Sequence, residues 1–385
     1  MVKPRVLHCI TVYNGRAFVP RAVESAMRMS AERADIDVLV LDDASPEPGW
    51  SEELAEFAAR VGALYYRTPR NLGIPRNVSL GMKVALEQGY DFVTINNSDV
   101  IFPANLIDVM VECCTANDNV GAVTASSNNV SIYSARNNDP DEYLSSQPVV
   151  DFVSGAAQTA FQGQVVDIPA GISFAIMIPA KVIDAVGLMD PVFGRGYCEE
   201  TDWSLRSLQA GYRICLAPGT FVYHEGGGSN VAAGLVAAGH TSVPENEAII
   251  DMRYPEFRNQ CHTFISAGGS NWYCEKLIHD VIDTAATRNG MAIQIDGLIT
   301  ETGVDQSVQV NIRLRDSHLT LDITHLGFLQ QFTMSEDAAC DYINLRFSLA
   351  RKTFAMRDKG RLASRLATLF EPTPSILYAG YPLRV

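Results

Sequence analysis

Short apolar runs alternate with longer segments of helical periodicity along the first part of the chain. This alternation predicts a mostly parallel sheet with helices packed on both faces. Because ligands bind at the carboxyl ends of the strands in such sheets, polar residues directly after each run are the candidates for chemistry. The runs are Val6–Thr11, Ile36–Leu41, Leu64–Arg67 and Tyr90–Ile95, and the helical segments are Phe18–Met29, Glu52–Arg60 and Asn77–Gln88.

The middle of the chain continues this pattern after a polar interruption. Ser126–Ser146 is rich in Asn and Ser and predicts a long loop. The later strands and helices end at a glycine run, Gly226–Gly228. The predicted strands are Val120–Ser126, Ile172–Ile178, Arg213–Leu216 and Phe221–Tyr223, and the predicted helices are Ala180–Val186 and Asp202–Ala210.

A different pattern follows Gly268-Gly269-Ser270, which we interpret as a hinge. We therefore predict an α/β fold, with a doubly wound, mostly parallel sheet over residues 1–265 and a smaller C-terminal α+β domain over residues 270–385. The second domain is expected to contain a helix at Trp272–Arg288, strands at Met291–Ile295, Val308–Leu314 and Leu319–Ile323, a hairpin turn at Arg315–His318 and a long helix or helix pair at Glu336–Phe370.

Composition and charge narrow the class of protein. Hydrophobic residues make up 47% and charged residues 19%, which is a globular composition, and the formal net charge of −14 argues against nucleic acid as a partner. The eight cysteines form no CxxC pair, so we expect reduced thiols in a cytoplasmic protein. No signal segment or long apolar span is evident, and membrane contact is expected to be at most peripheral, at the inner face of the membrane.

The most specific local motif is Asn97-Ser98-Asp99, directly after the strand that ends at Ile95. An oxygen-rich strand end of this kind suits a hard divalent cation held between the protein and a diphosphate. Asp99 is the expected ligand of Mn²⁺ or Mg²⁺. A strand followed by an Asx turn would give the same local sequence without a metal.

Three acids gather near the start of a predicted helix: Glu199, Glu200 and Asp202. Glu200, placed in the loop just before the helix, is the expected general base that takes a proton from an acceptor hydroxyl. Asp202 is equally well explained as the cap of that helix. Glu199 and Asp202 remain competing candidates for the base.

His224 follows a strand and precedes the glycine run. An imidazole at this position could complete the metal site, while the glycines would let the backbone approach phosphate. The alternative is a histidine with a purely structural role.

Taken together, residues Val6 to Ser229 resemble the family 2 glycosyltransferases of the GT-A fold, a Rossmann-like architecture. Val12-Tyr13-Asn14 resembles the family's first strand-end motif, and Val40 to Ser45 its acidic nucleotide motif. Asn71-Leu72-Gly73 through Asn77 and Gly81 resembles the stretch beneath the donor. Asn97-Ser98-Asp99 stands where the family has Asp-x-Asp. The run Gly196 to Arg206 with Gly211, and the segment His224 to Ser229, resemble the base and histidine motifs.

The resemblance implies specific roles for these residues. Asp42 would read the nucleobase and Asp43 would lie near the ribose, with Thr11 and Tyr13 in the same pocket. Asn71, Arg76 and Asn97 would line the donor site, Asp99 and His224 would hold the cation, and Glu200 would be the base. Two departures stand out: Asn97 replaces an acid of the metal motif, and Glu200 stands where many relatives carry Asp.

The implied activity is inverting transfer of a hexosyl or deoxyhexosyl group from a UDP- or dTDP-sugar. The acceptor would be a glycan, a lipid-linked molecule or a protein, as in bacterial rhamnosyltransferase-like enzymes of surface polysaccharide or glycoconjugate synthesis. The alternative is a catalytically inactive module that binds nucleotide sugars, suggested by Asn97. A nucleotidyltransferase is disfavoured, because no Gly-rich loop with Arg and Lys follows the first strand.

Basic residues concentrate near the C-terminus. They could form a solvated helix face, or a surface that docks on an anionic membrane, a lipid-linked acceptor or another subunit, including a second copy of the chain. These residues are Arg346, Arg351, Lys352, Arg357, Lys359, Arg361 and Arg365, with Ile343, Phe347, Ala350 and Phe354 at helical spacing between them.

Overall fold

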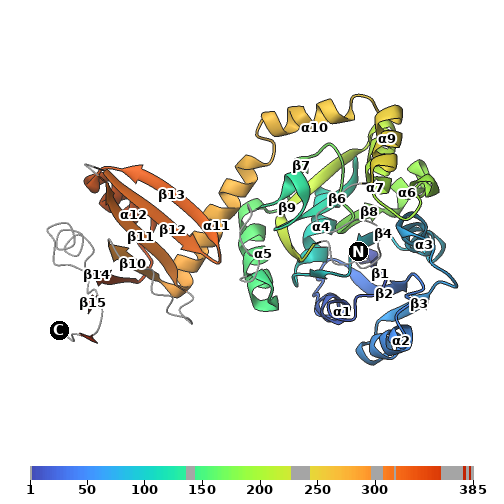
Figure 1. Cartoon of the computed structure of the whole chain (residues 1–385), viewed down its shortest axis with the longest axis horizontal. Helices are drawn as coiled ribbons and strands as arrows, with labels where there is room; N and C mark the ends of the chain where they lie inside the picture. The colour runs from blue at the N-terminus through green and yellow to red at the C-terminus, as the bar shows by residue number, and fades with distance from the viewer. Residues whose placement is uncertain are drawn as a thin grey trace. The chain divides into compact units, whose positions relative to one another are not determined.

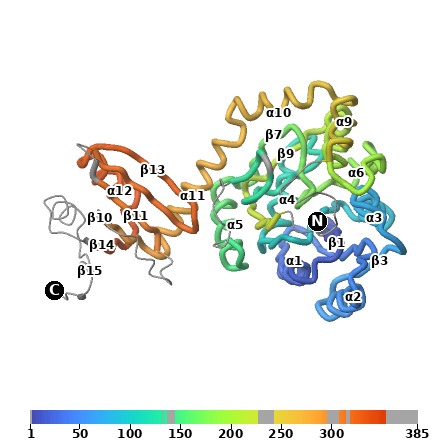
Figure 2. Tube along the Cα trace, viewed as in Figure 1, coloured from blue at the N-terminus to red at the C-terminus, as the bar shows by residue number. Residues whose placement is uncertain are grey.

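The computed structural model describes residues 2–135, 144–226, 243–295, 307–315, 318–356, 376–378 and 381–382. The chain divides into two compact units, Met1–Cys274 and Glu275–Val385. Figure 2 traces the first unit from its blue N-terminal strands to the yellow helices that end it.

Nine strands of the described residues form the sheet of the first unit (Figure 1), in the order β3-β2-β1-β4-β8-β6-β9-β5 with β7 beside β9. Strands β1, β2, β3, β4, β6 and β9 share one direction, and β5, β7 and β8 oppose it. The predicted α/β class with a mostly parallel sheet is confirmed. The bounds are β1 Arg5–Val12, β2 Asp35–Asp42, β3 Leu64–Arg67, β4 Phe92–Asn96, β5 Val100–Ile101, β6 Val120–Ser127, β7 Val166–Asp167, β8 Ala175–Pro179 and β9 Arg213–His224.

Helices pack on this sheet in groups. Helix α3 contacts β1, β4 and α6, and α6 in turn contacts α7, while α1 contacts β1, β2 and α2, and α4 and α5 contact β9. The helices of the unit are α1 Val19–Met27, α2 Trp50–Val61, α3 Ile74–Glu87, α4 Leu106–Ala116, α5 Gln147–Phe161, α6 Ala180–Val186, α7 Glu199–Gln209, α9 Pro244–Arg253 and α10 Phe257–Ser266, with short 3₁₀ turns at Ser131–Tyr133 and Pro191–Phe193.

Strand β1 shows why the first apolar run is continuous rather than alternating. Val6 to Ile10 are all buried, which is the pattern of a central strand covered on both sides. Helix α3 comes closest to it at Gly81, where a Cβ atom would lie 2.9 Å from Cys9 Sγ and 3.2 Å from Leu41 Cδ1. The glycine therefore sets the distance between helix and sheet.

The register of the sheet aligns the strand ends that carry the predicted chemistry. Val12 pairs with Asp42 in the β1–β2 ladder, and Ile10 pairs with Asn96 in the β1–β4 ladder. Thr11, Asp42 and Asn96 therefore lie at one edge of the sheet, as its parallel direction requires.

The second unit contains a sheet in the order β13-β12-β11-β10-β14-β15-β16. The predicted hairpin is present, because Arg315 pairs with His318 in the antiparallel β11–β12 ladder. In β12 buried and partly buried positions alternate, as in a sheet with one covered face. Its elements are α11 Asn271–Asn289, β10 Met291–Ile295, β11 Val308–Arg315, β12 His318–His325, β13 Phe328–Met334, α12 Glu336–Arg346, β14 Lys352–Met356, β15 Ile376–Tyr378 and β16 Tyr381–Pro382.

The predicted single long helix Glu336–Phe370 is wrong, and the second helix of the alternative pair would lie partly outside the described residues, which stop at residue 356 here. Helix α12 starts at the Ser335 cap and ends at Arg346, and Lys352–Met356 is a strand parallel to β10. Pairing with the edge of β10 overrides the helical spacing of Phe347, Ala350 and Phe354. Arg346 is not part of a basic face either, since its side chain is 8% exposed and its Nε lies 2.8 Å from Asp283 Oδ1.

Helix α7 also differs from the prediction, since it begins at Glu199 rather than at Asp202. Cys198 has a left-handed backbone, with φ of 71°, and marks the boundary. Glu200 therefore lies in the first turn of the helix instead of the preceding loop, and Asp202 does not cap it. The two short strands predicted at Arg213–Leu216 and Phe221–Tyr223 are one strand, β9, with a register shift against β6.

Some predictions fall outside the described residues. These are part of the loop Ser126–Ser146, the glycines 227 and 228 with Ser229, and the basic residues Arg357, Lys359, Arg361 and Arg365. Among the described residues, no helix is both long and apolar enough to cross a membrane. All eight cysteines are free thiols.

Two helical glycines give a matched test of the packing. Gly81→Ala should destabilise the protein or leave it unchanged, because the new methyl group meets Cys9 and Leu41. Gly155→Ala in α5 meets no atom within 4 Å and should stabilise it by about 1 kcal/mol through helix propensity. Urea unfolding of both variants checks this, and an equal gain at the two positions would contradict the close packing of α3.

Candidate active site

Asp99 and His224 lie side by side at the carboxyl edge of the sheet. Val100 pairs with His224 across the antiparallel β5–β9 ladder, and the Glu225 N–H donates to the Asp99 carbonyl at 2.9 Å. The pairing brings His224 Nε2 to 3.4 Å from Asp99 Oδ1. Asp99 is 2% exposed, so its carboxylate is almost inaccessible to solvent.

The imidazole is oriented by its surroundings. Its Nδ1 lies 2.8 Å from the Asn129 carbonyl oxygen, which can only accept, so Nδ1 carries the proton. The ring stacks on Phe174 at a centroid distance of 5.3 Å. The side-chain amide of Asn128 makes two hydrogen bonds with the backbone of His224. Its Nδ2 donates to the His224 carbonyl, and its Oδ1 accepts from the His224 N–H. In the neutral ring Nε2 is then the acceptor nitrogen, and it faces Asp99.

These residues fit a divalent cation. Asp99 Oδ1 is buried and has no hydrogen-bond partner among the described residues, and an unsatisfied carboxylate oxygen beside an acceptor nitrogen calls for a positive charge. Asn97 Nδ2 lies 3.3 Å from His224 Nε2 and adds no charge. Among the described residues no group of three or more His, Cys, Asp or Glu side chains is placed to hold a metal.

Asp42 is fully buried at the end of β2 and is surrounded by donors from the protein. Its Oδ1 accepts from the Ser45 N–H at 2.9 Å, and its Oδ2 accepts from Ser51 at 2.6 Å and Tyr65 at 2.8 Å. Burial and the Asp42 carboxylate raise the pKa of the Tyr65 phenol. Asp42 therefore organises the β2–α2 connection, and its predicted contact with a nucleobase stays a prediction.

Asp43 holds the loop that follows β3. Its carboxylate accepts from the Leu72 N–H at 2.7 Å, the Gly73 N–H at 2.9 Å and the Thr68 hydroxyl at 3.1 Å. Asn71 tightens the same loop by accepting from the Gly73 N–H at 3.1 Å. These bonds fix the backbone on which Ile74 and helix α3 begin.

The remaining predicted donor residues occupy the same edge with different exposure. Thr11 donates to the Asn96 carbonyl at 3.1 Å. Tyr13 is partly buried after the end of β1, and Arg76 is exposed in the first turn of α3. This arrangement does not test whether the three residues contact a nucleotide-sugar donor, and that contact stays a prediction.

The loop before α7 is fastened to the loop that Asp43 holds. The Ile74 N–H donates to the Arg195 carbonyl at 3.1 Å, and a Cβ atom on Gly73 would lie 2.3 Å from the Gly194 carbonyl oxygen. No side chain fits at Gly73. A backbone hydrogen bond therefore joins the loop that Asp43 holds to the loop before α7.

Glu199 and Glu200 form a pair of carboxyls at the start of α7. Glu199 is 3% exposed, and Glu200 is partly buried. Burial raises the pKa of Glu199 well above its usual range, and the adjacent charge of Glu200 adds to the shift. Burial also raises the pKa of Glu200, but hydrogen bonds from its own backbone N–H and from Glu199 oppose the rise. Burial therefore raises the pKa of both carboxyls and favours their protonated forms.

The carboxylate of Asp202 is held in a network of hydrogen bonds and ion pairs. Its Oδ2 accepts from Arg206 Nε at 2.9 Å, and its Oδ1 accepts from Arg253 Nη1 at 2.7 Å and from Tyr254 at 3.0 Å. Asp202 is fully buried and ties α7 to the end of α9. These contacts disfavour Asp202 as the base and leave the two glutamates.

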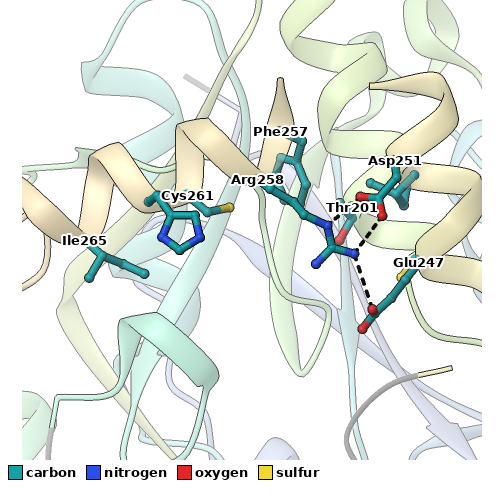
Figure 3. Close-up of a pocket in the computed structure, with 10 residues that line it drawn as sticks. Thr201, Glu247, Asp251, Phe257, Arg258, Cys261 and Ile265 are labelled. Carbon is teal, nitrogen blue, oxygen red and sulfur yellow. Dashed lines mark hydrogen bonds and ion pairs between the residues drawn. The ribbon is translucent and has the colours of Figure 1, made fainter. Parts of the chain in front are cut away.

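A cavity of about 270 Å³ opens between α7, α9 and α10 (Figure 3). Arg258 crosses it, with Nε 2.6 Å from Asp251 Oδ1 and Nη2 3.3 Å from Glu247 Oε2. Its guanidinium is thus neutralised by two acids. The cavity is lined by Cys198, Thr201, Glu247, Ile250, Asp251, Phe257, Arg258, Cys261, His262 and Ile265.

The structure thus brings Asn97, Asp99 and His224 together, places Asp42, Asp43 and Asn71 in the adjoining loops, and sets Glu199 and Glu200 apart at α7. Sequence analysis missed Asn128 and Asn129, although both follow strand β6 and so obey the strand-end rule. It also missed Phe174 and Asn246. No local sequence signal distinguishes these two, because their partners lie on distant elements.

Comparison with known proteins finds a family model that matches part of the chain. The model of glycosyl transferase family 2 matches residues 8–156. A curated relative, the undecaprenyl-phosphate mannosyltransferase of Micrococcus luteus, is 26% identical over 235 residues, covering 60% of this chain and 89% of the relative.

Two solved structures are distant likenesses. The mannosyltransferase PcManGT of Pyrobaculum calidifontis, in complex with GDP-Man and Mn²⁺, is 15% identical with a TM-score of 0.43, covering 74% of this chain and 76% of that one. GalNAc-T7 with UDP, GalNAc and Mn²⁺ is 12% identical with a TM-score of 0.46, covering 87% of this chain and 68% of that one.

The different surroundings of the acids predict opposite effects on stability. Asp202→Asn should lower the free energy of unfolding by about 3 kcal/mol, because it leaves Arg206 and Arg253 without their buried partner.

Glu199→Gln should have no such effect at pH 5 and should stabilise the protein at pH 8. A raised folded-state pKa means that stability is full below the unfolded value of about 4.5 and declines as pH rises toward the folded value, and glutamine removes that decline. Urea unfolding at both pH values checks the pair of variants. Equal losses for the two variants at both pH values would contradict these assignments.

Proposed function

We propose that this chain, whose residues 8–156 match the model of glycosyl transferase family 2, transfers a sugar from a nucleoside-diphosphate sugar to a hydroxyl acceptor with inversion and with a divalent cation. The observation that carries the proposal is the buried, unsatisfied Asp99 Oδ1 facing His224 Nε2 at 3.4 Å.

Asp99 and His224 would hold the cation, with the donor diphosphate supplying further oxygen ligands. Bound Mn²⁺ or Mg²⁺ would supply positive charge to offset the charge that develops on the departing nucleoside diphosphate. The Asn129 carbonyl keeps the proton of His224 on Nδ1, so Nε2 stays directed at the site. Asn97 contributes an amide rather than a charge, which makes Asp99 the dominant protein ligand.

Glu200 would take the proton from the acceptor hydroxyl as that oxygen attacks the anomeric carbon. Its Oε2 is buried without a hydrogen-bond partner among the described residues, so it can receive a proton. Glu199, whose pKa is raised by burial and by the charge of Glu200, would keep its proton while Glu200 acts as the base. A single displacement on the face opposite the leaving diphosphate inverts the configuration.

The finer substrate assignments rest on resemblance. We propose a hexosyl or deoxyhexosyl donor carried by UDP or dTDP, and a glycan, lipid-linked or protein acceptor. The name of the curated relative, an undecaprenyl-phosphate mannosyltransferase, supports a lipid-linked acceptor among these. A role in surface polysaccharide or glycoconjugate synthesis at the cytoplasmic face of the membrane follows from the same resemblance. Residues 270–385 would serve acceptor, membrane or subunit contact.

Removal of the carboxylate at Asp99 should abolish the metal dependence of donor binding. With Asp99→Asn, we expect the affinity for UDP- and dTDP-sugars to become independent of Mn²⁺ and transfer to fall at least about 100-fold. Calorimetric titration with and without Mn²⁺ checks this. Unchanged metal-dependent binding in the variant would refute the assignment of Asp99 as a ligand.

Loss of the base should slow the chemical step without affecting the donor. Glu200→Gln is expected to reduce kcat by about 10²- to 10⁴-fold and to leave donor affinity unchanged. The anomeric configuration of the wild-type product, read by NMR, tests inversion directly. A wild-type protein that binds nucleotide sugars but neither transfers nor hydrolyses them would instead be a binding module.

A further inference from the structure

We infer that Asn246, at the start of α9, is a positioning residue that holds the Glu199–Glu200 pair in place through the loop before α7. The inference rests on the proposed function, since it takes Glu200 as the base. Nothing in the sequence motifs marks Asn246, which lies far along the chain from the acids that it serves.

The side chain of Asn246 gathers three backbone carbonyls of one loop. Its Nδ2 lies 2.8 Å from the Gly196 oxygen, 2.9 Å from the Tyr197 oxygen and 3.1 Å from the Phe193 oxygen. Asn246 is 7% exposed, so water cannot readily replace it. The two hydrogens of the Asn246 amide are shared among these three carbonyl oxygens and so fix the curvature of the loop. An ionised carboxylate or an alkyl group has no hydrogen to donate and cannot replace the amide.

The loop needs such a clamp, because its backbone is strained. Tyr197 and Cys198 are consecutive non-glycine residues in the left-handed region, each with φ of 71°. Such conformations persist only where their surroundings impose them, and they gather at functional sites. Cys198 directly precedes Glu199, so the direction in which the first turn of α7 presents its carboxyls depends on these two torsions.

The opposite side of the loop lies against α3. A backbone hydrogen bond from the Ile74 N–H to the Arg195 carbonyl ties it there at 3.1 Å. Asn246 restrains the same loop from the side of α9, at the carbonyls of Gly196 and Tyr197 next to the acids.

Removal of the Asn246 amide should act locally. Helix α9 is also attached to α7 by an apolar cluster of Phe193, Leu205 and Ile250 and by the contacts of Arg253 with Asp202. These remain in a variant of Asn246. We therefore expect helix α9 to stay packed against α7 in such a variant. The loop before α7 should no longer hold Glu199 and Glu200 in one arrangement.

The pH profile of kcat reports on the arrangement of the two carboxyls. Glu199 and Glu200 interact strongly, so a change in their separation or burial changes the pH dependence of the pair. Other titratable groups lie around the start of α7. They are Cys198 in the loop, Asp202 and Arg206 on α7, Glu247 and Arg253 on α9, Tyr254 after α9 and Arg258 on α10. None of these is altered by a substitution at Asn246.

The first experiment compares Asn246→Asp and Asn246→Ala with Asn117→Ala. Asn117 is a matched control, since its Nδ2 also bridges two backbone carbonyls, Cys113 and Gly163 at 3.0 Å each, but at the amino end of β6. Both Asn246 variants should lower kcat about 100-fold and shift the acidic limb of the kcat profile by about half a pH unit or more, with Mn²⁺-dependent UDP affinity unchanged. Asn117→Ala should change neither kcat nor the profile.

A kcat and pH profile for the Asn246 variants that match those of Asn117→Ala would overturn the inference. So would a parallel loss of UDP affinity, because a general structural defect would produce it. Asn246→Ser, which retains a donor, keeps the test decisive if the first two variants fail to fold.

A second experiment needs no turnover. Infrared spectra of the full chain with ¹³C-labelled glutamate should show a protonated carboxyl at neutral pH that Glu199→Gln removes, and Asn246→Ser should shift or weaken it. An unchanged signal in Asn246→Ser would overturn the positioning role. Should the wild type bind UDP-sugars without transferring or hydrolysing them, the proposed function fails and this spectrum alone decides the role of Asn246.

Discussion

The short antiparallel ladder between β5 and β9 is the constraint on which the candidate site depends. Only Val100 and Ile101 take part on one side, paired with His224 and Tyr223. This pairing sets the imidazole beside a carboxylate that the sheet has already buried, and the cost of that burial is offset only if a positive charge or proton lies between them. In the proposed function, this backbone geometry prepares the site for a cation before any ligand arrives.

The acidic motif after β2 has a second, structural role. Asp42 and Asp43 use their carboxylates to accept from Ser45, Ser51, Leu72 and Gly73, and thereby fix two connections of the sheet. The loop held by Asp43 in turn supports the loop before α7, which Asn246 holds from the other side. A continuous backbone path thus links the nucleotide motif to the acids Glu199 and Glu200, and it explains how residues distant in sequence keep a common geometry.

Much of this arrangement could be predicted from the sequence, because strand direction alone places Thr11, Asp42 and Asn97 at one edge. The pairing of Asp99 with His224 followed from the same rule. Three features could not be predicted. The start of α7 depends on a left-handed Cys198, the engagement of Asp202 depends on Arg253 from another helix, and the strand Lys352–Met356 depends on the open edge of β10. Each is set by tertiary contacts that override local propensity.

The central claim is that Asp99 and His224 bind one cation together with the donor diphosphate. Pulsed electron paramagnetic resonance of Mn²⁺ in the complex with a nucleoside diphosphate measures this directly, because it detects nitrogen nuclei bound to the metal. We predict coupling to one imidazole nitrogen in the wild type and its loss in His224→Leu. Mn²⁺ without nitrogen coupling in the wild type, or with coupling that persists in His224→Leu, would contradict the account.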